Sequence, residues 1–370
     1  MRIAPFRIER YFAKHEFSAP YLLCSSDCES MELGNLLALE PGAREQFHSL
    51  WLGYTDSRGD TQLREAIARL YEQISADQVL VHAGAEEAIF NFMNVVLDPG
   101  DHVIVHAPYY QSLGEVARSI GAEVCEWRGD SECAWELDLD DLEELLTART
   151  RVVVVNFPHN PTGFLPAPEF IRELSALSDR HGFIIFSDEV YRGLELDRGD
   201  RLPAFADVNE RAVSLGVMSK TYGLAGLRIG WLATRDDGLS REFAAFKDYT
   251  TICNSAPSEF LAALALRQAE TLVERNLRII RDNLDRLDPF FHSHRELFAW
   301  YRPRAGSIAF PTLLGGKVDE FCGDLLEKAG VLLLPGTLYG EGFNSFRIGF
   351  GRKNLPEALD KFEEYLQRCR

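Results

Sequence analysis

Residues 214–232, SLGVMSKTYGLAGLRIGWL, place a single lysine between an apolar run and a glycine-rich segment. Lys220 closely follows the apolar run, and Arg228 comes eight residues later. Sinking an unpaired ammonium at the end of a buried strand costs several kcal/mol, so lysine is unusual at this position. Either the side chain extends its charge to water, or burial keeps the amine neutral enough to attack a carbonyl group.

The composition of the chain limits its functional class. Its 370 residues carry 57 acidic and 39 basic side chains, with a net charge of -18, and 46% of them are hydrophobic. This length suffices for two domains with a substantial core. The acidic balance argues against binding to nucleic acid or to an anionic membrane, because both need a basic surface.

The cysteines and the apolar runs limit the cellular setting. The seven cysteines are scattered and form no CxxC pair, so we expect neither a disulfide framework nor a zinc site. No apolar run reaches the length of about 18 residues that a membrane span needs. The opening segment, MRIAPFRIERYFAKHEF, lacks the apolar core of a signal peptide. The sequence therefore predicts a soluble, cytoplasmic protein with no membrane association.

Helix-like and strand-like segments alternate over the first two thirds of the chain. The expected elements are a helix from residue 61, a strand over 78–83, a helix over 85–97, and strands over 102–106, 123–127, 151–156 and 183–187. Continuous apolar strands such as VVVV and FIIF are typical of a parallel sheet covered on both faces. Ligands bind such sheets at the carboxyl ends of the strands. Asn156, Asp188 and Lys220 all lie at or just past such ends.

The pattern changes at about residue 257. The expected elements there are one long helix over 258–287, a helix over 318–329, and strands over 309–311, 331–334 and 345–349. They predict a second, smaller α+β domain. We expect a large cofactor-binding domain over residues 46–257 and a small domain formed by residues 1–45 and 258–370.

A lysine that condenses with a carbonyl group points to pyridoxal phosphate, which enzymes hold as a Schiff base. Such a site also needs a carboxylate at the pyridine nitrogen and hydrogen-bond donors to the phenolic oxygen. An aromatic side chain must stack on the cofactor ring, and cations and backbone N–H groups must bind the phosphate. Asp188 would supply the carboxylate, with the charge of the ring offsetting its desolvation. Its alternative role is the N-cap of a helix.

Three motifs carry the most specific information. They are NFPHNPTG at residues 156–163, SDEVY at 187–191 and SKTYGLAGLRIG at 219–230. Together they resemble the fold-type-I, class I and II pyridoxal-phosphate aminotransferases, over nearly the whole chain. The resemblance implies an α/β fold, in which a large domain with a mostly parallel seven-stranded sheet flanked by helices is joined to a smaller α+β domain.

The resemblance implies a role for each conspicuous residue of these motifs. Asp188 would hold the pyridine nitrogen of pyridoxal 5'-phosphate. Asn160 and Tyr191 would donate to its phenolic oxygen. Arg228 would bind its phosphate, and Ser219 would also contact the cofactor.

The aromatic plate and the phosphate turn lie earlier in the chain. The resemblance implies that Tyr110 stacks on the cofactor ring and that Gly84, Ala85 and Glu86 form the phosphate turn. A strand, a glycine and a helix in this order point backbone N–H groups at an anion, although ordinary turns share the arrangement. Because phosphate would repel the carboxylate of Glu86, we expect this residue to bind through its N–H with the side chain turned away.

Two further matches concern the substrate and the assembly. Arg347, in SFRIG, would clamp the α-carboxylate of the substrate in a bidentate pair, with Asn160 beside it. Tyr54, in GYTDSRG, matches a tyrosine that reaches the phosphate of a neighbouring subunit. The resemblance therefore implies a homodimer with shared active sites.

The predicted reaction moves an amino group between an amino acid and a 2-oxo acid. Lys220 would act as general base and acid, assisted by Asp188 and Tyr191. The chain also resembles capreomycidine synthase, a cyclising member of the family, so elimination, replacement or ring closure at Cβ is the alternative. Tyr191 favours transamination, because that synthase lacks this tyrosine in the resemblance. An effector-binding regulator is a third hypothesis, but the sequence has no basic DNA-binding segment.

The substrate's side chain is not specified by any motif. The candidates for contacting it are Asp27, Glu29, His159 and Tyr339. Each of them has an equally good structural role, as a solvated acid, a turn residue or a packed ring.

Overall fold

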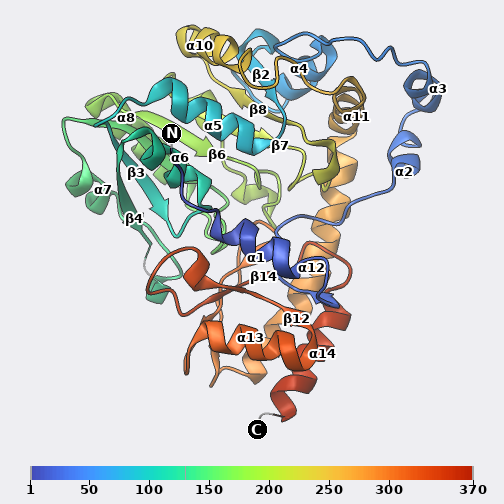
Figure 1. The fold of residues 1–370 in the computed structure, drawn as a ribbon, viewed down its shortest axis with the longest axis vertical. Coiled ribbons are helices and arrows are strands. Elements are labelled where there is room, and N and C mark those ends of the chain that lie inside the picture. The colour runs from blue at the N-terminus through green and yellow to red at the C-terminus, as the bar shows by residue number, and fades with distance from the viewer. Residues whose placement is uncertain (1, 130, 369–370) are drawn as a thin grey trace.

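The computed structural model describes residues 2–129 and 131–368 (Figure 1). A seven-stranded sheet with its helices fills one part of the molecule. A smaller part, built mainly from the C-terminal third of the chain, lies below it in this view. The long helix α12 (Ala269–Ser293) runs between the two parts.

The large sheet confirms the predicted fold class. Its strands are β2 (Val79–His82), β3 (His102–Ala107), β4 (Glu123–Arg128), β5 (Thr150–Asn156), β6 (Ile184–Asp188), β7 (Val213–Val217) and β8 (Gly230–Ala233). Their order is β2-β8-β7-β6-β5-β3-β4, and only β8 runs antiparallel to its neighbours. The parallel strands bring their carboxyl ends to one edge of the sheet, which is where the polar residues of the motifs lie.

Helices cover both faces of this sheet because its central strands are apolar on both sides. In β5, Val152 and Val154 pack in one cluster with α5 (Ala85–Val96) and α6 (Ser112–Ile120). Val153 and Val155 pack on the opposite face with α7 (Leu139–Leu145) and α8 (Pro168–His181). The remaining helices around the sheet are α4 (Thr61–Ala68), α9 (Phe205–Val208), α10 (Asp237–Lys247) and α11 (Ala256–Arg267).

The smaller part combines two helices with short strands. Its helices are α13 (Val318–Ala329) and α14 (Leu355–Arg368). Its strands are β1 (Tyr21–Leu22), β9 (Phe298–Ala299), β10 (Ile308–Ala309), β11 (Thr312–Leu313), β12 (Val331–Leu332), β13 (Leu334–Pro335) and β14 (Phe346–Gly349). They form the three-stranded sheet β10-β14-β13 and the pairs β1-β12 and β11-β9.

The single helix expected over residues 258–287 is wrong. Two helices occupy this stretch, α11 and α12, and Gln268 between them is non-helical with φ -110° and ψ 22°. Leu261 and Leu264 of α11 pack in the cluster under α4, whereas Leu277 of α12 packs in the cluster under α5. The chain turns at Gln268, which allows the two helices to pack in different clusters. Because glutamine is a good helix former, the sequence gives no signal of a break there.

The N-terminal segment touches both parts. Helix α1 (Arg7–His15) lies across the middle of the molecule between them. The short helices α2 (Leu33–Leu37) and α3 (Ala43–His48) project at the edge in Figure 1. Leu36 of α2 packs in the same cluster as Leu261 of α11. The boundaries at residues 46 and 257 stay a prediction.

Within residues 2–129 and 131–368, no helix is long and apolar enough to cross a membrane.

The stacked rings of Phe92 and Phe186 join α5 to β6, with their centroids 4.1 Å apart. Phe92→Ala removes a fully buried ring and leaves a cavity, so we expect the free energy of unfolding to fall by about 3–5 kcal/mol in urea denaturation. Phe17→Ala is the matched control, because that ring is 93% exposed. A loss within about 0.5 kcal/mol for both variants would contradict this account of the core.

Candidate active site

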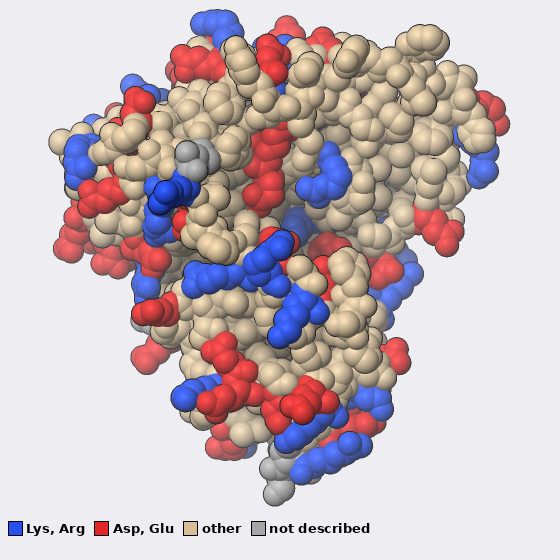
Figure 2. Space-filling view, viewed as in Figure 1, with Lys and Arg blue, Asp and Glu red and all other residues tan. Residues whose placement is uncertain are grey.

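Most of the predicted site residues line one cavity of about 340 Å³ at the carboxyl edge of the large sheet. They are Ala85, Glu86, Tyr110, Asn160, Asp188, Tyr191, Ser219, Lys220, Arg228 and Arg347. Two predicted site residues do not line this cavity: Gly84, which directly precedes Ala85 in the chain, and Tyr54. Figure 2 shows acidic and basic side chains gathered at the centre of this face, over α1 and near α5.

Lys220 lies three residues past the end of β7, with its amine inside the cavity. Its Nζ donates to the hydroxyl of Ser26 at 2.7 Å. Burial lowers the pKa of this amine, while the nearby carboxylate of Asp27 opposes the shift. The position therefore holds a desolvated amine.

Asp188 is the last residue of β6 and is buried. Burial raises the pKa of its carboxyl to about 7, although the Val190 N–H and the nearby Lys220 both favour the ionised form. Its Oδ1 accepts from that N–H at 3.2 Å, but the backbone enters a turn there and no helix begins. The carboxylate is thus available to a cationic group in the cavity.

Asn156 and Arg347 hold the Asn160 turn from two sides. The Asn156 side chain accepts from the backbone N–H of Asn160 at 2.7 Å and donates to the Asp188 carbonyl at 2.8 Å. From the smaller part of the molecule, Nη1 of Arg347 lies 2.9 Å from the Tyr339 hydroxyl and 3.4 Å from Oδ1 of Asn160. Arg347 is only 2% exposed, so its guanidinium is a preorganised cation in the cavity that also contains the Lys220 amine.

The glycine turn before α5 lies against Arg228. Gly84 has φ +89°, and a Cβ there would lie 2.6 Å from Nη2 of Arg228. A Cβ on Gly230 would in turn lie 2.7 Å from the carbonyl carbon of Gly84. Because α5 begins at Ala85, its first N–H groups have no partners within the helix. The turn therefore offers N–H groups and a guanidinium to an anion.

Glu86 differs from its expected orientation. Its carboxylate accepts from the Ser112 hydroxyl at 3.2 Å and lies close to Tyr110 and Arg228, instead of turning away. Burial raises the pKa of this carboxyl, and the hydroxyls of Ser112 and Tyr110 moderate the shift. These two neighbours explain why the side chain stays beside the cavity.

The hydroxyl of Tyr191 is an unused donor in the cavity. The side chain is 1% exposed, and its hydroxyl forms no well-aligned hydrogen bond among the described residues, although Ser26 lies near it. A desolvated amine, a buried acid, an unused hydroxyl and an anion-binding turn are the groups that pyridoxal phosphate requires. The residues present therefore fit this cofactor.

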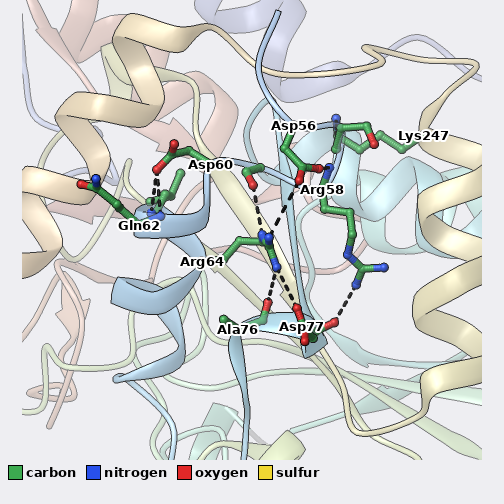
Figure 3. Close-up of polar contacts among 11 residues, drawn as sticks. Asp56, Arg58, Asp60, Gln62, Arg64, Ala76, Asp77 and Lys247 are labelled. Atoms are coloured by element: carbon green, nitrogen blue, oxygen red, sulfur yellow. Dashed lines mark hydrogen bonds and ion pairs between the residues drawn. The ribbon is translucent and has the colours of Figure 1, made fainter.

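The loop after Tyr54 is held by buried cations (Figure 3). The Arg64 guanidinium donates to the Gly59 carbonyl at 3.0 Å. The ammonium of Lys247 donates to the Ser57 carbonyl at 3.1 Å. Tyr54 itself is 94% exposed. A fixed loop thus presents an aromatic side chain to the outside of the molecule.

Several lining residues were not predicted from the sequence. They are Glu9, Phe12 and Glu16 of the α1 segment, Ser25 and Ser26, and Arg352. The apolar spacing in the first twenty residues predicts a helix, but no local signal places it against a cavity.

Only one of the four candidate substrate contacts lines the cavity, and it is Asp27. Glu29 accepts from the backbone N–H of Lys353, and Tyr339 lies behind Arg347. His159 stacks on His106 with ring centroids 3.6 Å apart. The described residues contain no group of three or more His, Cys, Asp or Glu side chains that could hold a metal ion.

Asp188 makes the stability of the cofactor-free protein depend on pH. Its raised pKa, about 7, means that the folded chain keeps a proton which the unfolded chain has released, so the free energy of unfolding falls as the pH rises through 7. Asp188→Asn removes this cost. In urea denaturation we expect its advantage over the wild type to grow by about 2–3 kcal/mol between pH 5 and pH 8. Glu144→Gln, at an exposed position, serves as control, and a pH-independent difference for Asp188→Asn would contradict the burial argument.

Known proteins resemble this chain over most of its length. The family model "Aminotransferase class I and II" matches residues 23–362. The chain is 33% identical to a capreomycidine synthase from Streptomyces vinaceus, over 97% of this chain and 93% of that protein. It is 31% identical to an aspartate aminotransferase from Thermotoga maritima, over 88% of each chain.

A solved structure gives the same result for the fold. The structure of a PLP-dependent aminotransferase from Streptococcus suis superposes with a TM-score of 0.93 at 31% identity, covering 100% of this chain and 99% of that one. The family, the fold and the cofactor predicted from the motifs are confirmed. The chain belongs to the class I and II aminotransferases, enzymes that depend on pyridoxal 5'-phosphate.

Proposed function

We propose that Lys220 is the residue at which this enzyme moves an amino group between an amino acid and a 2-oxo acid. The observation that supports this most directly is that one desolvated amine shares a single cavity with a buried carboxyl, Asp188, and a buried guanidinium, Arg347, and both groups act on its pKa. An acid and a cation near an amine are what a substrate with an α-carboxylate and the cofactor require together.

When bound, pyridoxal phosphate supplies an electron sink that stabilises negative charge at the substrate Cα. Asp188 would hold the pyridine nitrogen protonated, and Arg347 would bind the α-carboxylate. Lys220 would take the Cα proton and return it on the cofactor side, as general base and acid. Tyr191 and Asn160 would donate to the phenolic oxygen.

The remaining proposed contacts bind and orient the cofactor. Tyr110 would lie against the ring, and Ser219 beside it. Arg228 and the N–H groups of Ala85 and Glu86 would bind the phosphate, with Gly84 allowing their close approach.

Elimination or ring closure at Cβ is the second candidate reaction. The similarity to a capreomycidine synthase favours it, whereas the buried, unused hydroxyl of Tyr191 supports transamination. Supplying a 2-oxo acid distinguishes the two reactions, because only transamination consumes it. Release of ammonia or of a cyclic product would support the second candidate.

We further propose a homodimer with shared active sites. Four large side chains are strongly exposed: Trp51, Leu52, Tyr54 and Tyr249. The first three lie close to one another in sequence, and Tyr249 lies on a neighbouring loop. Exposed apolar patches of this kind mark interaction sites in soluble proteins. The partner is a second copy, and Tyr54 would reach the phosphate in its cavity. The domain boundaries at residues 46 and 257 and the cytoplasmic location remain predictions.

Lys220→Ala should abolish turnover, because among the described residues that line the cavity Lys220 is the only lysine available to move the proton. We expect the visible absorbance of the lysine-bound cofactor to disappear, and kcat to fall by at least about 10⁴-fold. Stopped-flow absorbance with an amino acid, followed by a 2-oxo acid, measures both effects. Retention of full activity would end this proposal.

Trp51→Glu should weaken the dimer, because it places a charge in an apolar interface. We expect sedimentation velocity to show monomer at micromolar protein, together with weaker cofactor binding. Leu314→Glu is the control at an exposed apolar position elsewhere. A Trp51→Glu protein that remains dimeric and keeps its cofactor affinity would refute the shared site.

A further inference from the structure

The charges that line the cavity are unequal in number. Its carboxylates are Glu9, Glu16, Asp27, Glu86 and Asp188. Its cations are Lys220, Arg228, Arg347 and Arg352. The proposed function uses Asp188, Lys220, Arg228 and Arg347 for the cofactor and the α-carboxylate. The contacts of the remaining charged residues then determine which substrate side chain the cavity accepts.

Arg352 is already neutralised. Its Nε and Nη2 donate to the two carboxylate oxygens of Asp27, both at 2.8 Å. A bidentate pair of this kind is among the strongest polar contacts in proteins. Among the described lining residues, no cation is therefore left for a second carboxylate on the substrate. The described chain by itself therefore offers no cation to an acidic side chain on the substrate.

Two carboxylates on one helical face form no ion pair among the described residues, although cations lie near them. Glu9, Phe12 and Glu16 follow the i, i+3, i+7 spacing that aligns side chains along a helix. Glu16, just past the last residue of α1, forms no hydrogen bond or ion pair through its carboxylate among the described residues, and Glu9 accepts only the Tyr110 hydroxyl, at 2.9 Å. Burial raises the pKa of the Glu16 carboxyl, and the neighbouring Glu9 and Asp27 add to this effect against Arg352 and Arg347.

The face formed by Glu9, Phe12 and Glu16 lies close to Arg347, the proposed binding group for the α-carboxylate of the substrate. The Arg347 guanidinium lies over the Phe12 ring, 5.7 Å from its centroid. Glu9 and Glu16 line the same cavity as Arg347, so a substrate whose α-carboxylate binds Arg347 would have its side chain in a space that also contains these two carboxylates. The unused hydroxyl of Tyr191, itself 1% exposed, indicates that a ligand occupies the same cavity, and the proposed function assigns this donor to the cofactor.

We propose that the substrate is an amino acid with a cationic side chain, an ammonium or a guanidinium, and that Glu16 and Glu9 bind this cation. This inference rests on the proposed function, which places the α-carboxylate on Arg347. An acid that is costly to bury alone becomes favourable when it is paired and hydrogen-bonded. The pair would therefore select against neutral side chains of the same shape.

Matched amino acids test the proposal on the holoenzyme. Arginine and citrulline have nearly the same shape but differ in charge, and lysine and norleucine form a second pair. We expect kcat/KM of the amino-acid half-reaction to be at least about tenfold higher for the cationic member of a pair. Glutamate should react more slowly still. Equal rates within both pairs would overturn the proposal while leaving transamination intact.

Variants locate the effect. Glu16→Gln should lower kcat/KM for the cationic amino acid by about 10- to 100-fold and leave its neutral partner nearly unchanged, and Glu9→Gln should do so to a smaller extent. Glu144→Gln, exposed on α7, is the matched control. A merely structural role would lower both members of a pair equally, and that result would also overturn the proposal.

Binding without turnover separates this inference from the proposed function. Calorimetry on the Lys220→Ala variant loaded with cofactor measures the affinity for each member of a pair. If no amino acid reacts with the wild-type holoenzyme, the proposed function fails, and the calorimetric ratio alone decides the inference. A preference of tenfold or more for the cation supports it, and a ratio near one refutes it.

Discussion

The active site depends on charged groups that are held out of water at the carboxyl edge of one sheet. Lys220 and Asp188 each lose hydration there, and the two desolvation costs act in opposite directions on their pKa values. Neither group is strongly paired in the described chain, so both are ready to interact with what enters the cavity. The parallel strands enforce this arrangement, because they bring residues from distant motifs to the same edge.

Much of the fold could be predicted because its signals are local. The apolar runs of β5 and β6 and the glycine before α5 each occupy a few consecutive residues, and they indicate a strand, a helix and a parallel sheet directly. The break at Gln268 could not be predicted. It results from the need to fill two separate clusters on either side of the turn, and this is a property of the packed molecule and not of the residue.

The candidate site divides in the same way. Three site residues could be predicted because each belongs to a short continuous motif: Asn160, Asp188 and Lys220. The residue types within each motif were enough to identify them as site residues. Ser26 and the acidic face of α1 come from a segment about 200 residues away from Lys220 along the chain, and only the folded backbone brings them together. Glu86 shows the limit of reasoning from charge alone, because two hydroxyl neighbours hold it where repulsion was expected to turn it away.

The contact of Arg347 with the N-terminal segment has a consequence for biosynthesis. Its Nε donates to the Cys24 carbonyl at 3.0 Å, and Arg352 is paired with Asp27. The cavity is therefore completed by contacts between residues more than 300 positions apart in the chain. Such contacts form late and slowly, because a long loop must close before they are made. During synthesis on the ribosome, the first thirty residues must therefore wait for nearly the last ones. The sheet can fold early, whereas a complete pocket exists only once translation is almost finished.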